Sequence, residues 1–209
     1  MGLKNHGYIP KKRNTNDRTR KSLFVISTEG KNKTERLYFK QLNSKKVQIR
    51  FSKGRATDPL GMISELIREM KEIDFQPDMG DKAYCVLDSD FLDIKNEQIA
   101  IADKKACSNN INVIVSAPCF EVWYLCHFLY STKQYRSSDE VIKELEKYIP
   151  GYTKSMEGIY ERLLPLQVAA VKNAKKLEEY LKTDNKKPHT VGFIPSTEVY
   201  KIIGDYQAL

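Results

Sequence analysis

Four acidic side chains lie shortly after apolar stretches of this sequence, and they are Glu29, Asp88, Asp90 and Glu121. Carboxylates that gather in one place repel each other, and a hard divalent cation such as Mg²⁺ or Mn²⁺ is the usual compensation. A cation held in this way can activate a water molecule and neutralise charge on a phosphoryl group. These residues are therefore candidates for metal-assisted chemistry, provided that the fold brings them together.

The residues next to these acids, and the spacing between two of them, are also compatible with a functional site. Asp88 and Asp90 are two residues apart, and side chains at that spacing in an extended chain share a face. Gly30 directly follows Glu29 and would let the backbone turn sharply or approach a substrate closely. Each pattern by itself is typical of a solvated turn, so the interpretation depends on their order and on the strands before them.

Apolar runs alternate with helical periodicity over the first 130 residues. Strands are predicted at 23–27, 47–51, 83–87 and 111–115. Helices are predicted at about 30–43, from Asp58-Pro59 onward, at about 95–109, and from Pro118 through an aromatic-rich stretch. This alternation predicts an α/β fold with a parallel four-stranded sheet sandwiched by helices. Since parallel strands end at one edge, Glu29, Asp88, Asp90 and Glu121 are expected to share that edge.

After residue 130 the pattern becomes helical, and no further strand is predicted. Helices are expected from Ser138 to about Tyr148, at 159–164, around 166–181, and at the C-terminus with Ser196 or Thr197 as the cap. We therefore expect a basic arm over 1–22, an α/β domain over 23–130, and a helical extension over 131–209 packed on that domain.

Positive charge is concentrated at the start of the chain. The formal net charge is +8, and residues 1–22 hold seven Lys and Arg residues against one acid, Asp17. This arm, with Lys11, Lys12 and Arg13 at its centre, is either a solubilising tail or a segment that contacts phosphates without sequence preference. Lys31, Lys33 and Arg36 begin the first predicted helix. They either contact phosphates together with free helix N–H groups or form an exposed polar face.

The cysteines and the hydropathy argue against a disulfide-linked, zinc-binding or membrane-spanning protein. The four cysteines form no C-x-x-C pair, so we expect free thiols rather than disulfides or a zinc site. Cys119, Cys126 and His127 do not share one helical face, and the aromatic stretch around Trp123 is expected to pack in the core. No apolar run approaches the roughly 20 residues of a membrane span, so a soluble cytoplasmic protein is expected.

Four longer strings give the sequence a family resemblance. They are "EGKNKTERLYF" (29–39), "VLDSDF" (86–91), "SAPCFEVWYLCHF" (116–128) and "FIPSTEVYKII" (193–203). Together they are similar, in the same order, to the RloB-like family, over about residues 23 to 205. Glu29-Gly30 followed by Asp88-Ser89-Asp90 also resembles the Toprim catalytic fold of topoisomerases, primases and OLD-type nucleases.

The resemblance implies a role for each acid. Glu29 would be the general acid/base or a metal ligand, and Asp88 and Asp90 would be the metal-binding pair for Mg²⁺ or Mn²⁺. Glu121 falls in the Phe-Glu-x-Trp stretch of the family, which departs from the core Toprim pattern. The implied activity is a nuclease acting on RNA or DNA in bacterial phage defence, beside a cognate ATPase of ABC or AAA type.

Two other functions stay open. A HAD-like phosphatase would use Asp88 as nucleophile and Asp90 as acid/base. However, the motif follows the third strand rather than the first, and Leu92 stands where that class has Thr or Val. A non-catalytic module that binds nucleic acid or an ATPase is the other alternative.

Overall fold

The computed structural model describes residues 20–29, 33–89, 93–190 and 192–209. The strands are β1 (Ser22–Thr28), β2 (Val47–Phe51), β3 (Lys82–Asp88), β4 (Ile111–Ala117) and β5 (Ser196–Thr197). The helices of the first part are α1 (Lys33–Lys40), α2 (Pro59–Glu72), a 3₁₀ turn η1 (Pro77–Met79), α3 (Asp93–Cys107) and α4 (Glu121–Cys126). Those of the second part are α5 (Ser138–Leu145), α6 (Ile159–Leu163), a 3₁₀ turn η2 (Leu164–Leu166), α7 (Gln167–Thr183) and α8 (Val199–Gln207).

The strands form one mostly parallel sheet in the order β2-β1-β3-β4-β5. β1 to β4 run parallel as predicted, and the α/β fold class is confirmed. The predicted four-stranded sheet is wrong in one respect, because β5 adds a fifth strand, antiparallel to β4. Ser196 and Thr197 form this strand and do not cap the last helix, whose N-cap is Glu198.

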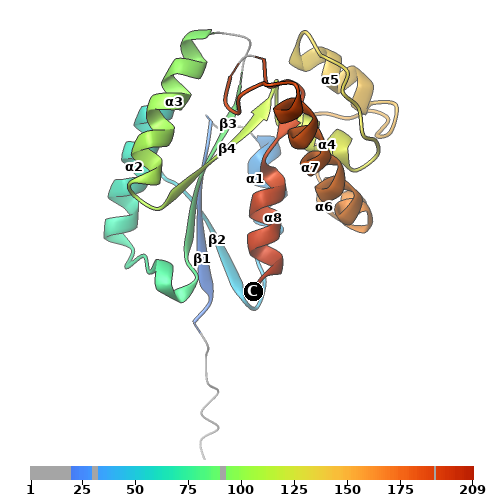
Figure 1. Ribbon diagram of the computed structural model, residues 1–209. Helices are drawn as coiled ribbons and strands as arrows, with labels where there is room; N and C mark the ends of the chain where they lie inside the picture. The colour runs from blue at the N-terminus through green and yellow to red at the C-terminus, as the bar shows by residue number, and fades with distance from the viewer. Residues whose placement is uncertain (1–19, 30–32, 90–92, 191) are drawn as a thin grey trace, which may run out of the picture.

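Helices cover both faces of the sheet (Figure 1). On one face α2 and α3 pack on the side chains of Val25, Cys85 and Leu87. On the other face Phe24 and Tyr84 belong to a second core cluster, which α1, α4 and α8 help to form. The alternation of side chains along β1 and β3 thus supplies two separate cores, as expected for a central sheet.

Helix α4 joins the sheet to the later helices. Trp123 of α4 has none of its surface exposed and lies in the same core cluster as Val141 of α5 and Ala174 of α7. The core on this face is therefore continuous from the sheet into the second half of the chain.

Asp81 fixes the opposite end of the sheet, just before β3. Its two oxygens accept hydrogen bonds from the guanidinium of Arg20 and from the backbone N–H groups of Leu23 and Gln76. Burial alone would raise the pKa of this carboxyl, but these hydrogen bonds outweigh it and lower the pKa. Gly80 directly before it has a positive φ of 86°, and a Cβ there would meet Ser22 Oγ at 2.8 Å.

The outer edge of β4 is only partly covered. Ser116 and Ala117 pair with β5, while residues 111–115 have no described strand beside them on that side. Among the described helices, none has the length and apolar character needed to cross a membrane.

Candidate functional site

Glu29 and Asp88 meet at the carboxyl edge of the sheet. β1 and β3 are neighbours, and their register pairs Thr28 with Val86. Glu29 therefore follows β1 beside the last residues of β3, and the backbone N–H of Asp88 donates to Glu29 Oε2 at 3.4 Å. Both residues are partly exposed. The predicted convergence of these two strand ends is thus present in the structure.

Glu121 lies in the first turn of α4, which follows β4, the neighbour of β3. Only 1% of its surface is exposed, and its Oε1 accepts a hydrogen bond from the hydroxyl of Tyr152 at 2.9 Å. Its Oε2 is buried without a hydrogen-bond partner among the described residues. Glu121 is therefore a carboxylate that the fold has removed from water.

Glu121 and Asp88 both influence the pKa of the Cys119 thiol. Burial raises the pKa of this thiol well above its ordinary value, and the charges of Glu121 and Asp88 raise it further. The effect of a charge weakens with distance, so Glu121 and Asp88 both lie in the neighbourhood of Cys119.

The third predicted ligand cannot be placed, because Asp90 lies outside the described residues. Within the described part of the chain, no group of three or more His, Cys, Asp or Glu residues could hold a metal ion. Glu29 and Asp88 supply carboxylate oxygens, which are the donors that Mg²⁺ and Mn²⁺ take. The described site therefore fits such a cation in donor type, and it contains two of the three residues predicted as ligands.

The comparison with protein families gives a match that includes these strand ends. The family model described as "RloB-like protein" matches residues 24–205. The chain belongs to the RloB-like family. No curated protein and no solved structure matches it.

The second half of this RloB-like chain contributes directly to the carboxylate edge, by which we mean the end of the sheet at which Glu29, Asp88 and Glu121 lie. The segment between α5 and α6 carries Tyr152, which donates to Glu121, and Lys154, whose Nζ lies 4.0 Å from Glu121 Oε1. Thr34 of α1 donates its hydroxyl to the backbone oxygen of Lys154 at 2.9 Å. The segment is thus attached to both α4 and α1.

Lys154 lies in the field of several acids. Burial alone would lower the pKa of its ammonium, but the charges of Glu121, Asp88 and Glu35, with the thiol of Cys119, outweigh this and raise the pKa. Glu35 lies in the first turn of α1, and only 3% of its surface is exposed. Sequence analysis missed Tyr152 and Lys154, because neither follows a predicted strand.

The predicted basic residues are only partly placed. Lys11, Lys12, Arg13 and Lys31, and the side chain of Lys33, lie outside the described residues. Arg36 is exposed, and its guanidinium carbon lies 4.6 Å from the centre of the Phe51 ring at the end of β2. Arg36 therefore lies at the carboxyl end of the sheet, and its contact with nucleic acid stays a prediction.

His127 and the cysteines show no sign of a metal site or of disulfide bonds among the described residues. His127 Nδ1 lies 2.9 Å from the backbone oxygen of Trp123, and burial lowers its pKa to about 4 against the opposing effect of that contact. It is therefore neutral near pH 7. The four cysteines are free thiols, as predicted, and Cys107 alone among them is exposed.

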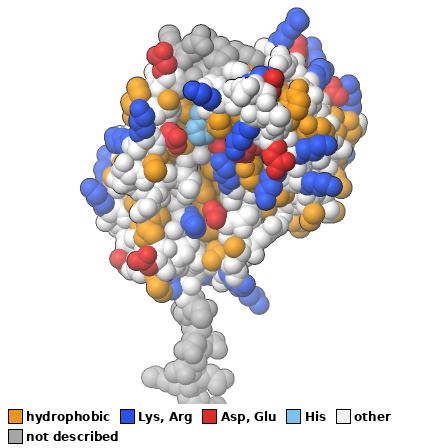
Figure 2. All heavy atoms as spheres, in the orientation of Figure 1, with side chains coloured by type: hydrophobic (Ala, Val, Ile, Leu, Met, Phe, Trp, Pro, Cys, Tyr) orange, Lys and Arg blue, Asp and Glu red, His pale blue; other side chains and the backbone are white. Residues whose placement is uncertain are grey.

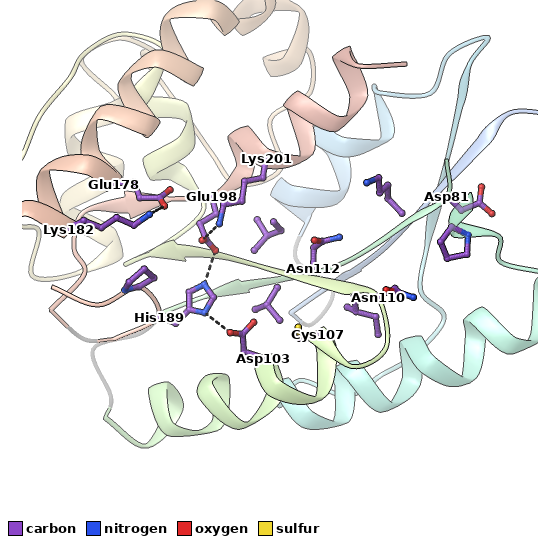
Figure 3. A pocket seen from close by; sticks show the side chains of 16 residues that line it. Asp81, Asp103, Cys107, Asn110, Asn112, Glu178, Lys182, His189, Glu198 and Lys201 are labelled. Carbon is purple, nitrogen blue, oxygen red and sulfur yellow. Dashed lines mark hydrogen bonds and ion pairs between the residues drawn. The ribbon is translucent and has the colours of Figure 1, made fainter. Parts of the chain in front are cut away.

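A separate cavity of about 680 Å³ lies along the open edge of β4 (Figure 3). Its polar centre is Glu198, which accepts hydrogen bonds from the backbone N–H of Val115 at 3.0 Å and pairs with Lys201. His189 Nε2 lies 2.9 Å from Glu198 Oε2, and His189 Nδ1 lies 3.8 Å from Asp103 Oδ2 (Figure 3). Glu29, Asp88 and Glu121 do not line this cavity.

Proposed function

We propose that this RloB-like chain is a metal-dependent nuclease that hydrolyses phosphodiester bonds in RNA or DNA. The observation that carries the proposal is the contact between Glu29 and Asp88. The backbone nitrogen of Asp88 lies 3.4 Å from Glu29 Oε2, so these two acidic residues are neighbours at the ends of adjacent strands. Glu121, from the neighbouring strand-to-helix connection, adds a third acid to the same edge.

The residues would divide the chemistry by their surroundings. Asp88, Asp90 and Glu29 would hold Mg²⁺ or Mn²⁺, which when bound neutralises phosphoryl oxygens and lowers the pKa of a water molecule. Glu29 is partly exposed, so its carboxylate could also accept a proton from an attacking water. Glu121 is buried and bonded to Tyr152, so its part would be to orient the segment that carries Lys154.

We further propose that the nuclease acts in bacterial phage defence with a partner ATPase. Membership of the RloB-like family supports this, since the resemblance drawn from the sequence associates the family with such loci. The family model matches residues 24–205, so both the carboxylate edge and the segment at 150–158 fall within the matched region.

The test compares wild type with Glu29→Gln and Asp88→Asn on total RNA and on plasmid DNA. We expect cleavage with Mg²⁺ or Mn²⁺, none with EDTA, and a loss of about 10²- to 10⁴-fold in each variant, the range for a removed acid or base. Glu146→Gln is the matched control, because Glu146 is exposed on the surface after α5. It should cleave like wild type.

The outcome that contradicts the proposal is cleavage that persists in both variants or in EDTA. Release of phosphate from small monoesters, with an acyl-phosphate on Asp88, would favour the phosphatase. Tight binding of an ATPase without any cleavage would favour the non-catalytic module.

A further inference from the structure

Lys154 is the basic side chain that the structure pairs with Glu121 at the carboxylate edge. A phosphodiester is an anion, so a rim of carboxylates repels it unless cations accompany it. Its Nζ lies 4.0 Å from Glu121 Oε1, and the charges of Glu121, Asp88 and Glu35 all raise the pKa of its ammonium.

The backbone that carries Lys154 is fixed on both sides. Tyr152, two residues earlier, is buried with 4% of its surface exposed and donates to Glu121 at 2.9 Å. The backbone oxygen of Lys154 itself accepts from Thr34 Oγ1 at 2.9 Å. These two bonds attach the segment to α4 and to α1, so the root of the Lys154 side chain has a defined position at the edge.

The ammonium, in contrast, is loosely engaged. Its contact with Glu121 Oε1 is 4.0 Å, longer than a hydrogen bond, and 49% of the side chain is exposed. A lysine ammonium has three donors, and Nζ makes no hydrogen bond within the described part of the chain. A lysine that served only to neutralise Glu121 would be expected to lie closer and to be more buried.

From this arrangement we infer that Lys154 contacts the non-bridging oxygens of the substrate phosphodiester, so that the second half of the chain supplies the phosphate-binding cation of the site. This inference rests on the proposed nuclease function. It adds a residue and a role that neither the strand-end motifs nor the basic residues of α1 indicate.

The test measures the binding of a labelled single-stranded oligonucleotide by fluorescence anisotropy over a range of salt concentrations. The full chain carries Glu29→Gln, so that cleavage does not interfere, and is compared with the same chain that also carries Lys154→Met. We expect weaker binding and a slope of log K against log salt that is smaller by about 0.7, the value for one lost phosphate contact on a single strand. Lys154→Arg should restore most of the slope.

Two controls separate a phosphate contact from a structural role. Lys147→Met removes an exposed lysine that pairs with Glu144, and it should leave the slope unchanged. The double substitution Lys154→Met with Glu121→Gln removes the ion pair as a whole. If it binds with the wild-type slope, Lys154 only neutralises Glu121 and the inference is overturned.

The remaining outcomes are also decisive. An unchanged slope in Lys154→Met, or no binding by the chain at all, overturns the inference. Because binding is measured without cleavage, a reduced slope in Lys154→Met supports the contact even if the wild-type chain cleaves neither RNA nor DNA. That second result would count against the proposed reaction alone.

Discussion

At the scale of single residues, the burial of Glu121 is made tolerable by Tyr152. A carboxylate with 1% of its surface exposed has lost nearly all contact with water, and such a group must be hydrogen-bonded to avoid a large desolvation cost. The Tyr152 hydroxyl supplies that bond, and the Glu121 charge in turn raises the pKa of Tyr152 beyond the effect of burial. The two residues therefore stabilise each other across two parts of the chain.

We predict that Tyr152→Phe lowers the free energy of unfolding by about 1–3 kcal/mol, because it leaves Glu121 Oε1 buried without its donor. Urea denaturation followed by the fluorescence of Trp123, the only tryptophan, measures this. Tyr148→Phe is the control, since Tyr148 stacks on Phe128 and its hydroxyl makes no hydrogen bond among the described residues. Equal stability of wild type and Tyr152→Phe would contradict the prediction.

Sequence analysis could identify Glu29, Asp88 and Glu121 but not Tyr152 or Lys154, for a physical reason. The ends of parallel strands lie at one edge by the geometry of the sheet, so a strand-end acid can be placed from local pattern alone. The segment at 150–158 reaches the edge through tertiary contacts with α4 and α1, which are distant from it in sequence. No local periodicity carries that information.

At the scale of elements, the start of α2 could be predicted from two adjacent residues, Asp58 and Pro59. Asp58 has extended backbone angles and accepts from the N–H of Gly61 at 2.8 Å, and Pro59 occupies the first turn. The side chain thereby satisfies one of the N–H groups that a helix start leaves without a partner. The Asp-Pro pair alone was enough to predict where this helix begins.

We predict that Asp58→Ala lowers the free energy of unfolding by about 1 kcal/mol, the usual cost of a lost N-cap. Asp58→Asn retains the accepting oxygen and should differ little from wild type. The same urea denaturation measures both. A cost in Asp58→Asn equal to that in Asp58→Ala would show that the charge, and not the cap, matters.

The strand β5 is the element that local pattern could not predict. Two residues are too few to show the alternation of a strand, and Ser and Thr before an apolar helix are also typical caps. What decides the outcome is Glu198, which bonds to the edge of β4 through both its side chain and its backbone N–H. That partner is 83 residues away in sequence.

At the scale of the whole molecule, His189 connects distant parts of the chain. Its two ring nitrogens lie near Glu198 at the start of α8 and near Asp103 on α3, which belong to opposite faces of the sheet (Figures 1 and 3). Burial alone would lower the pKa of His189, but Glu198 and Asp103 outweigh it and the nearby Lys201, and the pKa is raised.

We predict that His189→Gln destabilises the fold more at about pH 5.5 than at about pH 9. A group whose pKa is raised in the folded state contributes its full stability below its unfolded pKa of 6.5. That contribution is lost as the pH rises through the folded pKa. Urea denaturation of wild type and variant at both pH values measures the difference, and an equal cost at both would contradict the prediction.

The open edge of β4 has a consequence for how this chain behaves in concentrated solution. An uncovered strand edge is a template on which another chain can add a strand, which is how many sheets begin to form fibres. Here the uncovered part of β4, residues 111–115, is flanked by the ion pairs of Lys201 with Glu198 and of Lys182 with Glu178. Acidic and basic side chains are interspersed on this face of the molecule (Figure 2). An incoming strand would have to strip water from these charges, so the margin of the sheet resists growth by strand addition.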